Sequence, residues 1–184
     1  MHDHLREWVR IDNEREPSPS SAIIDFHCVK SAALVSEQVG FDAGKLINGR
    51  KRFLTVDTLG LVLRVFVTAA SVGERSGGKR VQRASQTHGQ SSVTVAHDLG
   101  RWWLRRQPFH DLGHGRLSLD CTSGAATVAN NHASCCSRNA LVVERTFGWL
   151  MGSRRLVRDY ELLPQTSETL IYLAMIRIMV RRLT

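Results

Sequence analysis

The chain has 184 residues and 42% hydrophobic content, which is enough for one domain with a core of its own. Its formal net charge of +8 favours a polyanionic partner, with nucleic acid first, although a basic surface without such a partner stays an alternative. The polar N-terminus carries no signal peptide and the longest apolar run is too short to cross a bilayer, so we expect a cytoplasmic protein with reduced cysteines and no membrane partner.

The first predicted element is a short amphipathic helix within residues 1–16. Leu5, Trp8 and Val9 recur there at helical spacing. Two prolines among serines then mark a linker to the next element.

Residues 17–75 are expected to contain three strands. The β-rich runs are 22–29, 51–57 and 61–68, and the last of them alternates in a way that suits a strand buried on at least one face. The short segment 57–60 predicts a hairpin turn between the last two strands.

Residues 76–140 have a different character. No glutamate occurs between Glu74 and Glu144, and no lysine follows Lys79. Small and polar residues dominate, and no helical or strand period persists. Such a stretch buries too little apolar surface to offset the entropy of ordering it, so we expect it to be poorly ordered.

Residues 141–184 are expected to be helical. The first helix should run over 141–163, weakened by Gly148 and Gly152 and ended by Pro164. Thr166 is the expected cap of a second helix.

The second helix is expected to carry Glu168 in its first turn and to have one apolar and one basic face. The residues expected to face inward are Leu170, Leu173, Ala174, Ile178 and Leu183, with Arg177, Arg181 and Arg182 on the outer face or in the last turn, where the helix dipole alone explains them.

Several strings in the two flanks resemble the DDE transposases of bacterial insertion sequences, in the family's order. They are residues 15–25, 41–45, 49–52, 56–61, 142–150, 154–156 and 159–168. Residues 17–75 would then be the first half of the DDE domain, holding strands one to three, and 141–184 its C-terminal helical part. The helix within residues 1–16 would be the remnant of a longer helical region, so the chain resembles an N-terminally truncated member.

The resemblance implies a ribonuclease-H-like α/β fold, here degenerate: an N-terminal β-hairpin sheet plus C-terminal helices, with the middle poorly ordered. In the family, three acids lie on the first strand, the fourth strand and a late helix. Asp25 matches the first acid and Glu144 the third. Such carboxylates hold two Mg²⁺ ions that activate water or a 3′-hydroxyl and stabilise the leaving oxygen. Apart from the resemblance, Asp25 is an ordinary strand-end carboxylate and Glu144 a solvated helix residue.

The second acid has no counterpart. The family places it in a Trp-Ala-Asp-Gly-Gly-Tyr-like string, which is absent here, and Ala140 stands where a basic residue is expected before the glutamate. One permitted coding of residues 97–108, read one base later, gives Met-Ile-Trp-Ala-Asp-Gly-Gly-Tyr. We therefore interpret 76–140 as a frameshifted segment, a hypothesis that the gene's nucleotide sequence tests.

Other chemical patterns in that segment are interpreted as accidental. They are the histidines His110 and His114, the group His132, Cys135 and Cys136, and the pair Trp102 and Trp103; Asp98 is not promoted to a metal ligand.

Three functions stay open. The first is a transposase by descent, of a family that cuts and joins element ends, which is inactive as encoded; it would be located in the nucleoid, as a possible homodimer. The others are a non-catalytic DNA-binding remnant and a non-functional pseudogene product. The residues predicted to contact DNA are Lys45, Arg50, Lys51, Arg52, Arg145, Arg154 and Arg155.

Overall fold

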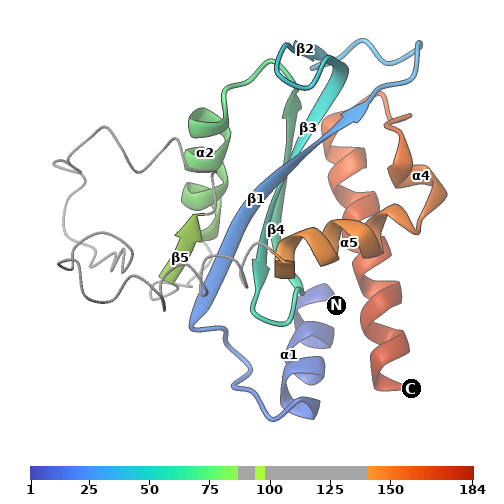
Figure 1. The fold of residues 1–184 in the computed structure, drawn as a ribbon. Helices are drawn as coiled ribbons and strands as arrows, with labels where there is room; N and C mark the ends of the chain where they lie inside the picture. The colour runs from blue at the N-terminus through green and yellow to red at the C-terminus, as the bar shows by residue number, and fades with distance from the viewer. Residues whose placement is uncertain (87–93, 98–140) are drawn as a thin grey trace, which may run out of the picture.

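The structure is a computed structural model that describes residues 1–86, 94–97 and 141–184. Its centre is a five-stranded mixed sheet flanked by helices on both faces (Figure 1). The elements in chain order are α1 His2–Asp12, β1 Ser21–Lys30, β2 Gly40–Asp42, β3 Ile47–Asp57, β4 Val62–Ala69, α2 Glu74–Gln86, β5 Thr94–His97, a helix over 141–151, α4 Arg154–Val157 and α5 Pro164–Leu183. None of the described helices combines the length and the apolar character needed to cross a lipid bilayer.

The strand order is β2-β3-β1-β5, and β4 also pairs with β3. β3 pairs antiparallel with β1 and with β4. β5 lies parallel to the first half of β1, with His97 opposite Ile24. The three predicted strands and the hairpin between the last two are therefore confirmed. The hairpin closes because Asp57 accepts hydrogen bonds from the backbone N–H groups of Leu59 and Leu61 at 3.0 and 2.8 Å.

The two faces of the sheet pack on different helices, because alternate residues of a strand point to opposite faces. On one face, Ile23 of β1 belongs to the main core with residues of α1, the 141–151 helix, α4 and α5. On the other face, Ile24 and Phe53 pack on Val81 of α2. A methyl group at Gly77 of α2 would collide with the Phe53 ring, so glycine lets this helix approach the sheet closely.

Part of the segment expected to lack order is ordered. α2 continues through residues 76–86, and β5 lies at 94–97, so the predicted boundary at residue 75 cuts through a helix. Packing on Phe53 and Phe66 contributes to the stability of this helix, because most helical stability in proteins comes from tertiary packing. The rest of the predicted segment, 87–93 and 98–140, lies outside the described residues.

The C-terminal helices differ from the prediction in their limits. The first helix ends at 151, and α4 follows after a turn at Gly152, so Pro164 does not end a helix but begins α5. Proline suits that first position, because its missing N–H would have no helical partner there. Thr166 is consequently inside the helix and is not its cap.

α5 turns a different face to the core than its sequence indicated. Ala174 is buried and Leu170 and Ile178 are partly buried, as expected, but Leu173 is 52% exposed. Its core positions are instead Ile171, Met175 and Met179, and Leu183 is exposed. Trp8 of α1, also expected inside, is 59% exposed.

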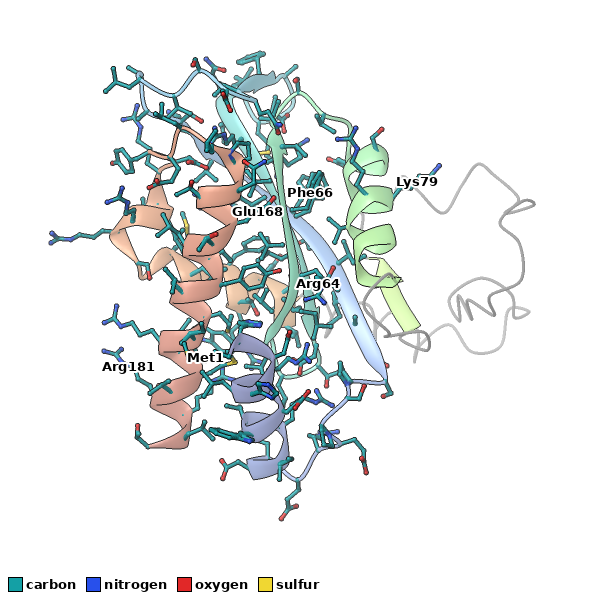
Figure 2. All side chains as sticks on the ribbon, turned by 180° about the vertical axis from the view of Figure 1, so that it is seen from behind. Met1, Arg64, Phe66, Lys79, Glu168 and Arg181 are labelled. Carbon is teal, nitrogen blue, oxygen red and sulfur yellow. The ribbon has the colours of Figure 1, made fainter. Side chains whose placement is uncertain are left out.

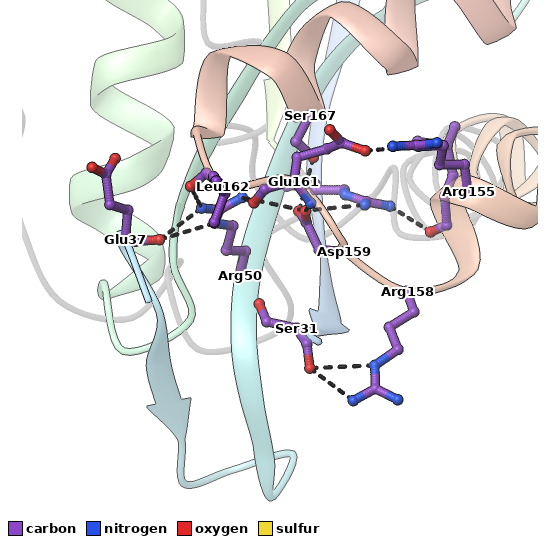
Figure 3. Close-up of polar contacts among 11 residues, drawn as sticks. Ser31, Glu37, Arg50, Arg155, Arg158, Asp159, Glu161, Leu162 and Ser167 are labelled. Atoms are coloured by element: carbon purple, nitrogen blue, oxygen red, sulfur yellow. Dashed lines mark hydrogen bonds and ion pairs between the residues drawn. The ribbon is translucent and has the colours of Figure 1, made fainter. Parts of the chain in front are cut away.

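Buried ion pairs attach the C-terminal segment to the sheet (Figure 3). Asp159, which is fully buried, lies 3.2 Å from Arg50 and 3.5 Å from Arg52 of β3, and the Ser167 hydroxyl donates to it at 2.8 Å. Arg50 also donates to backbone carbonyls of Glu37, Glu161 and Leu162. Two strings that are more than 100 residues apart thus meet at one buried carboxylate.

Candidate functional site

Asp25 lies in the middle of β1, on the face that packs against the C-terminal helices. It alternates with Ile23 and His27 on that face, and Ile23 is part of the main core. Asp25 is half-buried, and its Oδ1 accepts a hydrogen bond from the backbone N–H of Phe26 at 2.7 Å. The carboxylate therefore stands on a rigid, paired strand at the edge of the apolar core.

Glu144 is carried by the helix over 141–151. Val143, Thr146 and Leu150 of this helix are buried, at the spacing of a single inward face, and Glu144 is exposed beside that face. The ring of Phe147, one turn further along, lies 5.3 Å from the ring of His27. The helix with Glu144 is thus packed directly on the strand with Asp25.

The environment of His27 is cationic. Burial lowers the pKa of His27, and the positive charges of Lys45 and Arg52 lower it further. The imidazole is therefore neutral at pH 7 and adds no positive charge beside Asp25.

The donors in the described residues do not fit the expected two-ion magnesium site. Within 1–86, 94–97 and 141–184, no three aspartate, glutamate, histidine or cysteine side chains come together in a way that could hold a metal ion. Two carboxylates, one on a strand and one on a helix, supply too few oxygen ligands for the coordination spheres of two Mg²⁺ ions. Asp98, His110, His114 and the group around Cys135 lie outside the described residues.

The predicted DNA-contacting residues divide into two groups. Arg50, Lys51 and Arg52 are buried, with exposed fractions of 0–4%. Their polar atoms are engaged by the protein: the two arginines contact Asp159, and Lys51 lies 3.4 Å from Asp42 and donates to the Val72 carbonyl. Burial removes these three from direct phosphate contact, and they hold the fold instead.

The remaining predicted contacts are on the surface. Lys45, Arg145, Arg154 and Arg155 are exposed, and Arg155 pairs with Glu161 at 2.8 Å. Lys45 lies 4.6 Å from the centre of the Phe26 ring. For these four, the prediction of a DNA contact stays open.

The sequence analysis did not predict which groups accept hydrogen bonds from the backbone N–H groups at the open edge of β4. The Glu168 carboxylate accepts a hydrogen bond from the Val67 N–H at 2.9 Å, and the Tyr172 hydroxyl accepts one from the Val65 N–H at 3.1 Å. Figure 2 shows Glu168 on α5 beside β4. Burial raises the pKa of the Glu168 carboxyl, against the lowering effect of the Val67 N–H. Glu168 and Tyr172 are four residues apart, a spacing that predicts a shared helix face from the sequence alone.

A second missed feature joins the 141–151 helix to the hairpin turn. The Thr146 hydroxyl donates to the Gly60 carbonyl at 2.8 Å, and Arg145 donates to the Leu59 carbonyl at 3.4 Å. Gly60 has a positive φ of 82°, and a methyl group there would approach Thr146 and Trp149 too closely. The strings 56–61 and 142–150, which resemble the same family, therefore meet in space.

Comparison with known proteins gives one family match. Residues 123–181 match the family described as "Transposase DDE domain". The matched range includes Glu144 and Asp159 but not Asp25. No curated protein and no solved structure matches the chain.

Proposed function

We propose that the chain descends from a DDE-type transposase of a bacterial insertion sequence and is inactive as encoded. The match of residues 123–181 to a transposase DDE domain supports this descent. Enzymes of this type cleave and join DNA strands with divalent metal ions. The proposal includes DNA as the partner, a homodimer and a location in the nucleoid.

One observation carries the proposal. The matched range includes Glu144, and its helix packs on β1, the strand that carries Asp25, through the contact of Phe147 with His27. Asp25 and Glu144, which resemble the first and third acids of the family pattern, therefore stand on adjoining elements, and this supports the proposal.

A ribonuclease-H-like fold is proposed for the same reason. Support comes from the mixed sheet, from Asp25 on its first strand, from the late helix with Glu144, and from β5, which runs parallel to β1. The antiparallel hairpin sheet with helices after it agrees with the fold class expected from the sequence.

Inactivity is proposed because the described carboxylates are too few. Asp25 and Glu144 cannot fill the coordination spheres of two hard cations, and loss of one carboxylate weakens the hold on the cation whose positive charge would stabilise the leaving oxygen. Asp25 and Glu144 are the residues of this chain that would hold Mg²⁺.

The test uses the purified full chain with linear DNA carrying the element's ends, and Mg²⁺ or Mn²⁺. We expect salt-dependent DNA binding and no strand-transfer product. A product that is lost in Asp25→Asn and in Glu144→Gln would overturn the inactivity. Absence of binding even at low salt would remove DNA as the partner.

A non-catalytic DNA-binding role is the second candidate. It is favoured by the exposed Lys45, Arg145, Arg154 and Arg155, which need no metal to contact phosphates. The same binding measurement supports it if binding is equal with and without EDTA. A protein that is degraded rapidly by low concentrations of protease would instead favour a non-functional product.

A further inference from the structure

Two arginines contact one tryptophan where the C-terminal end of α5 meets the 141–151 helix. The guanidinium carbon of Arg145 lies 4.8 Å from the Trp149 ring centre, and that of Arg182 lies 4.3 Å from it. Arg145 and Trp149 share the 141–151 helix, one turn apart, whereas Arg182 comes from the last turn of α5. We call these three residues the Arg-Trp-Arg cluster.

Asp57 offsets only part of the positive charge of the cluster. Among the described residues, neither Arg145 nor Arg182 forms an ion pair, and the nearby Asp57 is occupied by Arg10. Burial lowers the pKa of Arg182, and the charge of Arg145 lowers it further, which Asp57 opposes. Two like charges held together in this way favour an anion between or across them.

The cluster is held by the backbone of the hairpin turn. Arg145 reaches the Leu59 carbonyl and Thr146 the Gly60 carbonyl, while the side chain of Trp149 packs over Gly60. A guanidinium held over an indole ring by a cation–π contact keeps N–H donors for hydrogen bonds to a ligand. The donors are therefore set in place before a ligand arrives, which lowers the entropic cost of binding.

The cluster also adjoins the candidate catalytic position. Arg145 directly follows Glu144, and both are exposed on the same helix. A backbone phosphate bound at Arg145 would lie within about one helical turn of the Glu144 carboxylate.

We propose that Arg145, Trp149 and Arg182 bind phosphates of a DNA strand and position that strand beside Glu144. Planar guanidiniums suit this task because each can donate two parallel hydrogen bonds to one phosphate. The inference rests on DNA being the partner of the proposed function, and it adds Trp149 and Arg182 to the residues that the sequence indicated. A purely structural role would fasten α5 to the hairpin without affecting DNA.

The experiment compares two double variants of the full chain that remove the same charge. Arg145→Ala with Arg182→Ala disrupts the cluster, whereas Lys79→Ala with Arg177→Ala removes two cations elsewhere, one of them from α2 on the opposite face of the sheet (Figure 2). Binding of a fluorescein-labelled 20-base-pair duplex is measured by anisotropy over a range of salt concentrations. Circular dichroism checks the fold of each variant.

Loss of two phosphate contacts should reduce the slope of log affinity against log salt by about 2 and weaken binding about tenfold at moderate salt, with little change in the control. Equal losses in both double variants would overturn the inference and leave the proposed function standing. A wild-type chain that binds no DNA would overturn both. If the cluster variant does not fold, Arg145→Gln alone, at an exposed position, should still reduce the slope by about 1, and an unchanged slope would overturn the inference.

Discussion

Two sets of carboxylates from the family-like strings have opposite environments. Asp159 is fully buried between Arg50 and Arg52, while Asp25 is half-buried and Glu144 is exposed. The first joins segments far apart in the chain, and the others stand at the junction of a strand and a helix. Similarity to a family therefore includes a residue that holds the fold, Asp159, as well as the acids that we propose as metal ligands.

The same division applies to the basic residues. The string 49–52 carries two arginines that sequence reasoning assigned to DNA, and the structure gives them to a buried carboxylate. Arg145, by contrast, is exposed. A basic residue in a strand that is buried on both faces is a structural cation far more often than a phosphate ligand, because burial without a partner is costly.

Removal of the buried carboxylate should have the largest effect on stability. Asp159→Ala leaves the Arg50 and Arg52 guanidiniums buried without their counter-charge, and we expect the free energy of unfolding to fall by about 3–5 kcal/mol. Urea unfolding followed by circular dichroism measures it. The control is Glu161→Ala, which breaks the ion pair with the exposed Arg155 and should cost less than about 1 kcal/mol. Similar losses of stability in both variants would show that the buried Asp159 carboxylate does not hold the fold more strongly than the surface pair.

A methyl group at the hairpin turn should have an intermediate effect. Gly60 has a φ of 82°, and a Cβ there would lie 2.7 Å from the Thr146 hydroxyl oxygen, so Gly60→Ala should cost about 1–2 kcal/mol. Gly73→Ala is the matched control, since a Cβ at Gly73 meets nothing within 4 Å. Equal melting temperatures of the two variants would show that the turn does not hold the 141–151 helix in place.

The partly buried Asp42 should give a smaller, pH-dependent effect. The Cys28 thiol, donating at 3.0 Å, holds the pKa of Asp42 at about 2, below the ordinary 3.8, with help from the Lys45 N–H and the Lys51 charge. The folded-state pKa is depressed, so this stabilisation is present above about pH 4 and lost as the pH falls through about 2. Asp42→Asn should flatten stability against pH in that window, with a loss at pH 7 of less than about 1 kcal/mol after screening.

If the free energy of unfolding fell equally with decreasing pH in Asp42→Asn and in the wild type, the acid sensitivity would belong to other carboxylates.

The candidate catalytic carboxylate should matter least for stability. Glu144 is exposed, so Glu144→Gln should change the free energy of unfolding by less than about 0.5 kcal/mol. The measurement is the same urea titration as for Asp159→Ala. A loss comparable to that of Asp159→Ala would place Glu144 among the residues that hold the fold and remove the distinction drawn above.

The local patterns of the sequence were sufficient for several elements. β-rich runs identified β1 and β3, alternation identified β4, the turn segment 57–60 identified the hairpin, and helical spacing identified α1. These signals are local because the side-chain periods of strands and helices are fixed by backbone geometry. The family-like strings likewise indicated Asp25 and Glu144 as the acids to examine.

Three features could be read only from the tertiary structure. They are the buried face of α5, the extension of α2 through residue 86, and the arginines that are exposed to a ligand. Each of these depends on what packs on the element. Val81 and Gly77 order α2 through Phe53, and Asp159 draws Arg50 into the interior from more than 100 residues away. Local patterns in the sequence thus predicted β1, β3, β4 and the family resemblance. Burial and charge pairing depend on long-range contacts, and they separated the basic residues that hold the fold from those that stay exposed.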